Sequence, residues 1–307
     1  MVLFPEARRA VELAASDVPA STPGYDVVAA REANLRAALA EEREHVAEVL
    51  DLDADGVPCR LYRPAGSALR DGVVVHLHGG GFVFHDVDVH DAPCRRFANR
   101  SGLSVLSVDY RRPPEHKFPA APDDVDTVIG WLDREDARHG LDGPTYAHGD
   151  SAGGNLALVA ALRRPERFRA VVLIYPFLDP TAAFDSYRSA ADGGFVPNEA
   201  AWYWQQYAAE PADLAHPDLA PLLSDRLGSL PPTLVVTSEH DVLRDEGEHL
   251  AALLAERGVE VVATRYLGQV HGFWRHESQF PAARALMSQV VGFLHTHAGD
   301  GPPSDAL

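Results

Sequence analysis

The residues Gly149-Asp150-Ser151-Ala152-Gly153 match the pattern G-x-S-x-G and lie between an apolar segment and a helical one. In a sharp strand-to-helix turn, flanking glycines leave room for a strained backbone that holds the serine hydroxyl clear of the main chain. The first N–H groups of the following helix then lie beside that hydroxyl and favour negative charge. The pattern therefore predicts that Ser151 is a nucleophile; a glycine-rich turn with a spectator serine is the alternative.

A serine hydroxyl becomes an effective nucleophile only beside a base, and the base needs an acid that orients it. Downstream of Ser151, one apolar run ends in Glu239-His240-Asp241, and the next is followed by a loop that contains His271. Because the carboxyl ends of parallel strands meet at one edge of a sheet, we assign Asp241 as the acid and His271 as the base. The rival candidates are Glu239 and Asp245 for the acid and His276 for the base.

The run His78-Gly79-Gly80-Gly81 ends a buried apolar segment. Three glycines expose backbone N–H groups, which suits the binding of a tetrahedral oxyanion. We expect the oxyanion hole to use N–H groups of Gly79, Gly80, Gly81 and Ala152. A phosphate loop is the alternative, although no G-K-[ST] sequence follows the glycines.

We predict no metal site. The pairs His76-x-His78 and His295-x-His297 could suggest a metal, but no carboxylate or thiolate accompanies them at zinc spacing.

From residue 73 onward, short apolar runs alternate with helical patterns, which is typical of a parallel sheet covered by helices on both faces. We predict strands over 73–78, 103–110, 145–150, 170–176, 233–238 and 259–267, and helices over 87–100, 120–138, 152–163, 244–257 and 280–297. Two helical patterns (10–15 and 25–44) and a hairpin with its turn at Asp53–Gly56 precede them.

Residues 177–230 interrupt this alternation with no strand candidate and with the aromatic cluster Trp202-Tyr203-Trp204. A connection of that length in a compact domain is expected to form a small unit of its own. We expect a helical insertion over the carboxyl edge of the sheet, where open α/β sheets bind ligands.

The composition excludes several classes of partner. Among 307 residues, 27 are Lys or Arg and 45 are Asp or Glu, which gives a formal net charge of −18. So acidic a surface repels nucleic acid and anionic lipid. Two cysteines cannot form a disulfide framework, and we recognise neither a signal peptide nor a transmembrane run, so a cytoplasmic protein is expected.

The motifs HGGG (78–81) and GDSAGG (149–154), followed by an Asp and then His-Gly-Phe, resemble those of the hormone-sensitive-lipase-like group of α/β-hydrolase esterases. The stretch YRRPPEHKFPAA (110–121) is similar to that family's YRLAPEHPFPAA segment, and the resemblance covers about residues 72–293. Two positions depart from the family pattern: His85 stands where glycine is common, and Val242 where proline is usual.

The resemblance implies an α/β-hydrolase fold, with a mostly parallel central sheet flanked by helices and a helical cap. It implies hydrolysis of carboxylic esters without a cofactor, with Ser151 as nucleophile, Asp241 as acid and His271 as base. The expected division of the chain is 1–44 for the N-terminal part of the cap, 45–176 and 231–298 for the core, 177–230 for the inserted cap segment and 299–307 for a flexible tail.

Because a folded cap bounds the pocket, we expect esters of short- to medium-chain acids as substrates. Candidate pocket residues are Phe82, Phe195, Trp202, Trp204 and Phe273, with a role in the cap's core as the alternative. Other readings are lactone or amide cleavage or acyl transfer by the same three residues, or a non-catalytic ligand receptor. The expected partner is a small-molecule ester, and a homodimer is left open.

Overall fold

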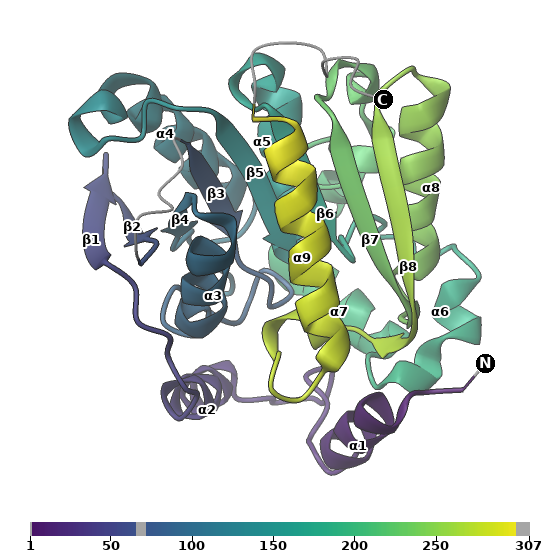
Figure 1. Ribbon diagram of the computed structural model, residues 1–307. Helices are drawn as coiled ribbons and strands as arrows, with labels where there is room; N and C mark the ends of the chain where they lie inside the picture. The colour runs from purple at the N-terminus through teal and green to yellow at the C-terminus, as the bar shows by residue number, and fades with distance from the viewer. Residues whose placement is uncertain (1, 66–71, 299–307) are drawn as a thin grey trace, which may run out of the picture.

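The computed structural model describes residues 2–65 and 72–298, and within them eight strands form one twisted sheet (Figure 1). In their order across the sheet, the strands are β1 (Glu48–Ala54), β2 (Val57–Arg63), β4 (Ser104–Val108), β3 (Val73–Leu77), β5 (Thr145–Asp150), β6 (Ala170–Ile174), β7 (Thr233–His240) and β8 (Val261–Val270). The pairings β1–β2 and β2–β4 are antiparallel and the others are parallel. The predicted α/β-hydrolase fold is therefore confirmed; the tail expected at 299–307 lies outside the described residues.

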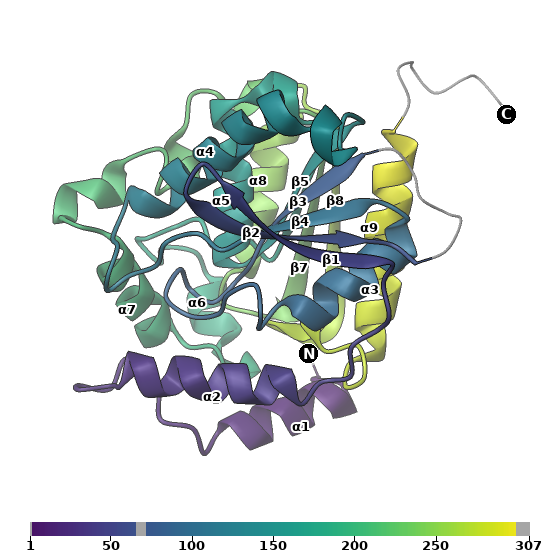
Figure 2. The same cartoon turned by 90° about the vertical axis from the view of Figure 1, so that its left-hand side faces the viewer.

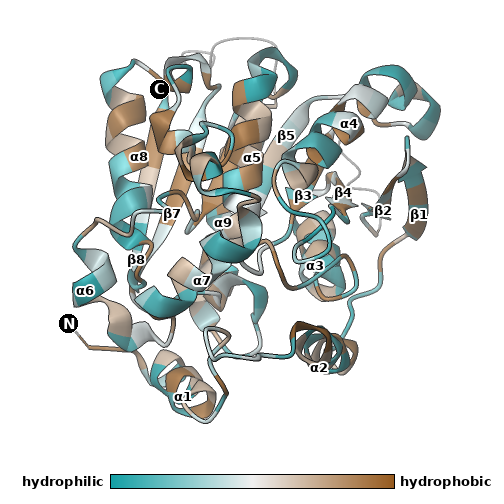
Figure 3. Cartoon of the chain, turned by 180° about the vertical axis from the view of Figure 1, so that it is seen from behind, coloured by the Kyte–Doolittle hydropathy of each residue, from teal (hydrophilic) through white to brown (hydrophobic). Residues whose placement is uncertain are grey.

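Helices cover both faces of the sheet (Figures 1 and 2). The helices on one face are α3 (Asp91–Ser101) and α9 (Pro281–Thr296), and those on the other are α4 (Ala120–Glu135), α5 (Ala152–Arg163) and α8 (Arg244–Glu256). Since side chains alternate along a strand, Val73 and Val75 enter the core on the α5 side while Val74 enters the core on the α3 side. Helix α5 is buried from Ala152 to Leu162, and Figure 3 shows apolar residues on the inner sides of α5 and α8.

Four further helices gather at one end of the molecule (Figure 2). They are α1 (Pro5–Ala14), α2 (Val27–Leu39), α6 (Ser186–Ser189) and α7 (Pro197–Tyr207). Pro5 begins α1 with a fixed φ that suits the first helical turn, and the Asp26 carboxylate caps α2 by accepting the N–H of Ala29 at 3.0 Å. None of the helices in the described ranges is long and apolar enough to span a bilayer.

Several element boundaries differ from those predicted, and two of these differences shape the site. Helix α3 begins at Asp91 instead of residue 87, because the Asp86 carboxylate accepts the N–H groups of Asp88 and Val89 and holds the preceding residues in a turn. Strand β8 ends at Val270 instead of residue 267. It contains an irregularity at Gly268 (φ +68°), beyond which its pairing with β7 resumes.

Candidate active site

Ser151 lies in the turn between β5 and α5, in the left-handed backbone conformation of φ 56° and ψ −121°. The backbone there is crowded: a Cβ atom added to Gly149 would lie 2.1 Å from the carbonyl oxygen of Gly153, and one added to Gly153 would lie 1.9 Å from that of Leu77. Both flanking positions therefore need glycine. Two backbone hydrogen bonds hold the turn: Ser151 N–H donates to Ile174 at 2.9 Å, and the Ser151 carbonyl accepts from Phe177 at 3.1 Å.

The structure brings Ser151, His271 and Asp241 together at the carboxyl ends of β5, β8 and β7. The Oγ of Ser151 lies 3.0 Å from Nε2 of His271, and Nδ1 of His271 lies 2.7 Å from Oδ2 of Asp241. The Asp241 side chain is fully buried, and its other oxygen accepts the N–H of Leu243 at 2.9 Å. An imidazole with its Nδ1–H directed at Asp241 presents the Nε2 lone pair to the serine hydroxyl, which is the arrangement required for proton abstraction.

The rival candidates from the sequence have other partners. Glu239 accepts the N–H of Gly268 at 2.8 Å and so fastens the irregular part of β8. Asp245 accepts the N–H of Ser186, at the start of α6, at 2.8 Å. His276 pairs with Glu41 at 3.3 Å.

The glycine run after β3 lies beside Ser151, but one of its predicted donors is occupied. The N–H of Gly79 donates to Oδ1 of Asp150 at 3.0 Å, so the expectation that it faces an oxyanion is wrong. The N–H groups of Gly80 and Gly81 have no hydrogen-bond acceptor among the described residues. Ala152 opens α5, so its N–H has no acceptor within the helix. Three of the four predicted donors are thus available.

A cavity of about 720 Å³ opens above these groups. Ser151, His271, Gly80 and Gly81 form part of its wall. The apolar wall is formed chiefly by residues of α1 and of the segment 177–203, namely Ala10, Val11, Leu13, Ala14, Phe177, Phe195 and Tyr203. Polar residues also line it: Asp17, Asn34, His85, Asp150, Glu199, Arg275, His276 and Gln279.

Of the five predicted pocket residues, Phe195 lines the cavity. Phe82, Trp204 and Phe273 are instead buried in the cores, which corrects the prediction. The Phe82 ring stacks on Tyr207 with centroids 3.7 Å apart, and Trp202 packs on Phe84 rather than on the cavity.

Sequence reasoning missed Tyr203 and Phe84, which do line the cavity. The i, i+4, i+7 spacing of Ala200, Trp204 and Tyr207 indicates the buried face of α7, and this signal would have assigned Trp204 to the core.

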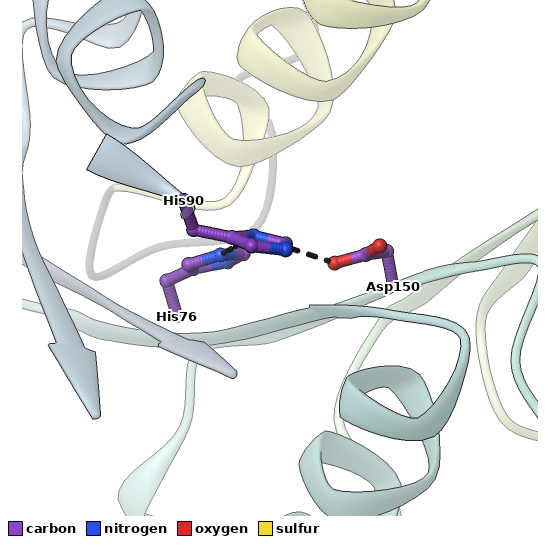
Figure 4. A group of neighbouring side chains, drawn as sticks. All are labelled: His76, His90 and Asp150. Atoms are coloured by element: carbon purple, nitrogen blue, oxygen red, sulfur yellow. Dashed lines mark hydrogen bonds and ion pairs between the residues drawn. The ribbon is translucent and has the colours of Figure 1, made fainter. Parts of the chain in front are cut away.

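His148, His76 and His90 form a chain of buried histidines, and Figure 4 shows His76 and His90 beside Asp150. His76 Nδ1 is 2.9 Å from Nδ1 of His148, and its Nε2 is 3.0 Å from Nδ1 of His90, which in turn lies 3.9 Å from an oxygen of Asp150. Burial lowers the pKa of His76 to about 3 and those of His90 and His148 well below the usual value, so the rings are neutral.

His76, His90 and Asp150 could in principle ligate a cation, since one potential ligand atom from each lies within 4.8 Å of the others. Both ring nitrogens of His76 already have hydrogen-bond partners, however, so a cation would have to displace the bond to His90. The arrangement fits a neutral hydrogen-bonded chain. The pair His295 and His297 is engaged elsewhere, with the Ser101 carbonyl at 2.7 Å and with Glu260 at 3.2 Å.

The chain is similar to known proteins in both sequence and structure. Residues 74–275 match a family described as having the alpha/beta hydrolase fold. The chain is 34% identical over 274 residues to an ethyl acetate hydrolase of Pseudomonas putida, covering 86% of each protein. It is 35% identical to the carboxylic ester hydrolase LipN of Mycobacterium tuberculosis, covering 89% of this chain and 77% of LipN. A hyperthermophilic esterase from Pyrobaculum calidifontis superposes with a TM-score of 0.87 and 37% identity, covering 97% of this chain and all of that one.

Proposed function

We propose that this chain, which belongs to the hormone-sensitive-lipase-like group of α/β-hydrolase esterases and is a carboxylesterase, cleaves short- to medium-chain acyl esters through Ser151, His271 and Asp241. The observation that supports this mechanism most is the pair of short contacts on the two nitrogens of His271, 3.0 Å to Ser151 and 2.7 Å to Asp241. Such a linear set of acid, base and nucleophile is the constellation that activates a serine.

In the acylation step, His271 Nε2 takes the hydroxyl proton as Ser151 Oγ attacks the ester carbonyl carbon. The carbonyl oxygen becomes an oxyanion, and the N–H groups of Gly80, Gly81 and Ala152 are the donors available to it. The carboxylate of Asp241 holds the imidazole in the correct tautomer and stabilises the imidazolium.

In the steps that follow, the imidazolium of His271 gives its proton to the departing alkoxide, and the carbon–oxygen bond to the alcohol breaks. This leaves an acyl group on Ser151. A water molecule then gives a proton to His271 and attacks the acyl carbon, and the acid is released as the proton returns to Ser151.

The size of the cavity limits the acyl chain. A space of about 720 Å³, with walls from α1 and from the segment 177–203, admits a small ester but bounds its length. A series of 4-nitrophenyl esters of increasing acyl length is expected to give its highest kcat/KM among the short and medium chains. Faster turnover of emulsified long-chain lipid would contradict this limit.

The direct test of the mechanism is Ser151→Ala with an ester that is turned over by the wild type. Turnover is expected to fall by roughly 10⁴- to 10⁶-fold, since the nucleophile is lost while binding is retained. Ser288→Ala is the matched control, because Ser288 is exposed on α9 and its hydroxyl donates only to the helix backbone. Near wild-type hydrolysis by Ser151→Ala would exclude the proposed nucleophile.

A further inference from the structure

Arg275 lines the same cavity as Ser151 and His271. Arg275 is the last residue of the short helical turn Phe273–Arg275, which begins two residues after His271. The side chain of Arg275 is half-buried. The sequence places a permanent positive charge within the wall of the candidate active site.

The guanidinium group of Arg275 makes no hydrogen bond or ion pair with any of the described residues. This is unusual in a chain with 45 acidic and 27 basic residues, and the nearby arginines differ. Arg96, Arg100 and Arg284 share the carboxylate of Glu277, at 3.7, 3.0 and 2.7 Å.

The acidic groups around Arg275 have other partners. Glu41 pairs with His276 at 3.3 Å. Asp150 accepts the N–H of Gly79, and no oxygen of it lies within ion-pair distance of Arg275. The charge of Arg275 still reaches both carboxyl groups, since it acts to lower the pKa values of Glu41 and Asp150. Arg275 therefore presents to the cavity a positive charge that no direct ion pair with a described residue neutralises.

Partial burial of a guanidinium costs hydration free energy, and this cost is offset only when an anion binds to the group. Its planar fork of donors matches a carboxylate, with which it forms two parallel charge-assisted hydrogen bonds. The carboxylates of Asp17 and Glu199 also line this cavity. A doubly charged group such as a phosphate monoester would be repelled there more strongly than a single carboxylate.

We propose that Arg275 forms an anion subsite and that this carboxylesterase favours esters carrying a free carboxylate, either on the acyl chain or on the alcohol. This inference rests on the proposed function, because it assigns the substrate class of the same site. It makes Arg275 a specificity-determining residue that binds a part of the substrate remote from the scissile bond.

Two matched pairs of esters test the subsite. On the acyl side, 4-nitrophenyl hydrogen adipate is compared with 4-nitrophenyl methyl adipate; on the alcohol side, 4-acetoxybenzoate is compared with 4-acetoxybenzamide. The quantity measured is the ratio of kcat/KM for the charged ester to that for its neutral partner. In Arg275→Gln this ratio is expected to fall by roughly ten- to a hundredfold for at least one pair, since a charge-assisted bidentate contact is lost. The pair that responds identifies the end of the substrate that faces Arg275.

Arg257→Gln is the control for the change in net charge, because Arg257 is exposed at the end of α8 and donates only to the Leu253 carbonyl. It is expected to leave both ratios unchanged. Ratios in Arg275→Gln that match the wild type within about twofold for both pairs would overturn the anion subsite. Wild-type protein that hydrolyses none of the four esters would instead count against the proposed function, so the two failures are distinguishable.

Discussion

Ser151 illustrates how one residue can be held in an unfavourable conformation for a chemical purpose. Its φ of 56° costs a non-glycine residue roughly 1–3 kcal/mol. The hydrogen bonds to Ile174 and from Phe177 maintain that conformation. The hydroxyl is thereby directed toward His271, and the free N–H of Ala152 lies next along the chain. A strained backbone, a directed hydroxyl and a free N–H group are thus found in two consecutive residues.

Asp150 is a positioning residue for the glycine run. Its carboxylate accepts the N–H of Gly79 at 3.0 Å, and this bond sets the direction of the following N–H groups of Gly80 and Gly81. Asp150→Ala leaves the Gly79 N–H buried without an acceptor, which favours rearrangement of the loop. We expect kcat to fall by roughly 10- to 100-fold with a smaller change in KM, because oxyanion contacts matter most in the transition state.

Asp150→Asn is the conservative comparison, because its amide oxygen can still accept from Gly79. It should recover most of the kcat lost in the alanine variant. Steady-state kinetics on one neutral ester measure both variants. Equal loss in the two, or a change confined to KM, would contradict a role in aligning the oxyanion donors.

At the scale of residues, the sequence predicts a site position where the backbone geometry permits only one residue type. It does not predict which of several possible partners a side chain contacts. Gly149 and Gly153 are required by close backbone approach, so their spacing located Ser151. A run of glycines does not indicate which of its N–H groups donates to a neighbouring carboxylate. The prediction that Gly79 is an oxyanion donor is wrong for that reason. Arg275 likewise has no ion-pair partner because Glu277 pairs with Arg100 and Glu41 pairs with His276, which the sequence does not indicate.

At the scale of elements, buried strands were predictable because both faces of a parallel sheet are covered and the sequence runs are continuously apolar. The residues at which strands and helices end were harder to predict. The extension of β8 depends on Gly268 and on its fastening by Glu239 from the neighbouring strand, a contact 29 residues away in the chain. This extension carries His271 to the edge that holds Asp241.

Asn155 connects helix α5 to the segment 177–230. Its buried amide nitrogen donates to the carbonyl oxygens of Phe177 and Leu219, each at 2.9 Å. Asn155→Leu removes both donors while keeping a similar volume, so two buried carbonyl groups lose a partner. We expect faster hydrogen exchange of amides in residues 177–220 than in the wild type.

The sheet serves as the internal reference for that measurement, because amides of β5 and β6 should exchange at unchanged rates if the loss is local. Acceleration spread evenly over the whole chain, or none in 177–220, would argue against this connection.

At the scale of the whole molecule, the buried histidine chain makes stability depend on pH. Burial lowers the pKa of His76 to about 3, while an unfolded histidine titrates near 6.5. Between these values the unfolded chain binds more protons than the folded one, so acidification favours unfolding. Burial raises the pKa values of Asp150 and Glu246. Above about pH 4 the folded chain therefore binds more protons at these two groups than the unfolded chain does, and acidification there favours the folded state.

The free energy of unfolding is therefore expected to decrease as the pH falls from about 6.5 toward 4, by up to about 1.4 kcal/mol per pH unit for each buried histidine. His76→Leu should make this decrease shallower by about one such contribution. Urea unfolding at several pH values measures both slopes. Identical slopes in the two proteins would show that His76 is not held neutral by the fold.

The most direct measurement of the central claim is covalent labelling with a fluorophosphonate, followed by peptide mass spectrometry. Such a probe reacts only with a serine activated by a base and an oxyanion hole. The proposed mechanism predicts one adduct per chain, on Ser151, that is absent from Ser151→Ala and forms far more slowly in His271→Ala. A wild-type chain that stays unlabelled, or one labelled on another residue at the same rate in Ser151→Ala, would contradict it.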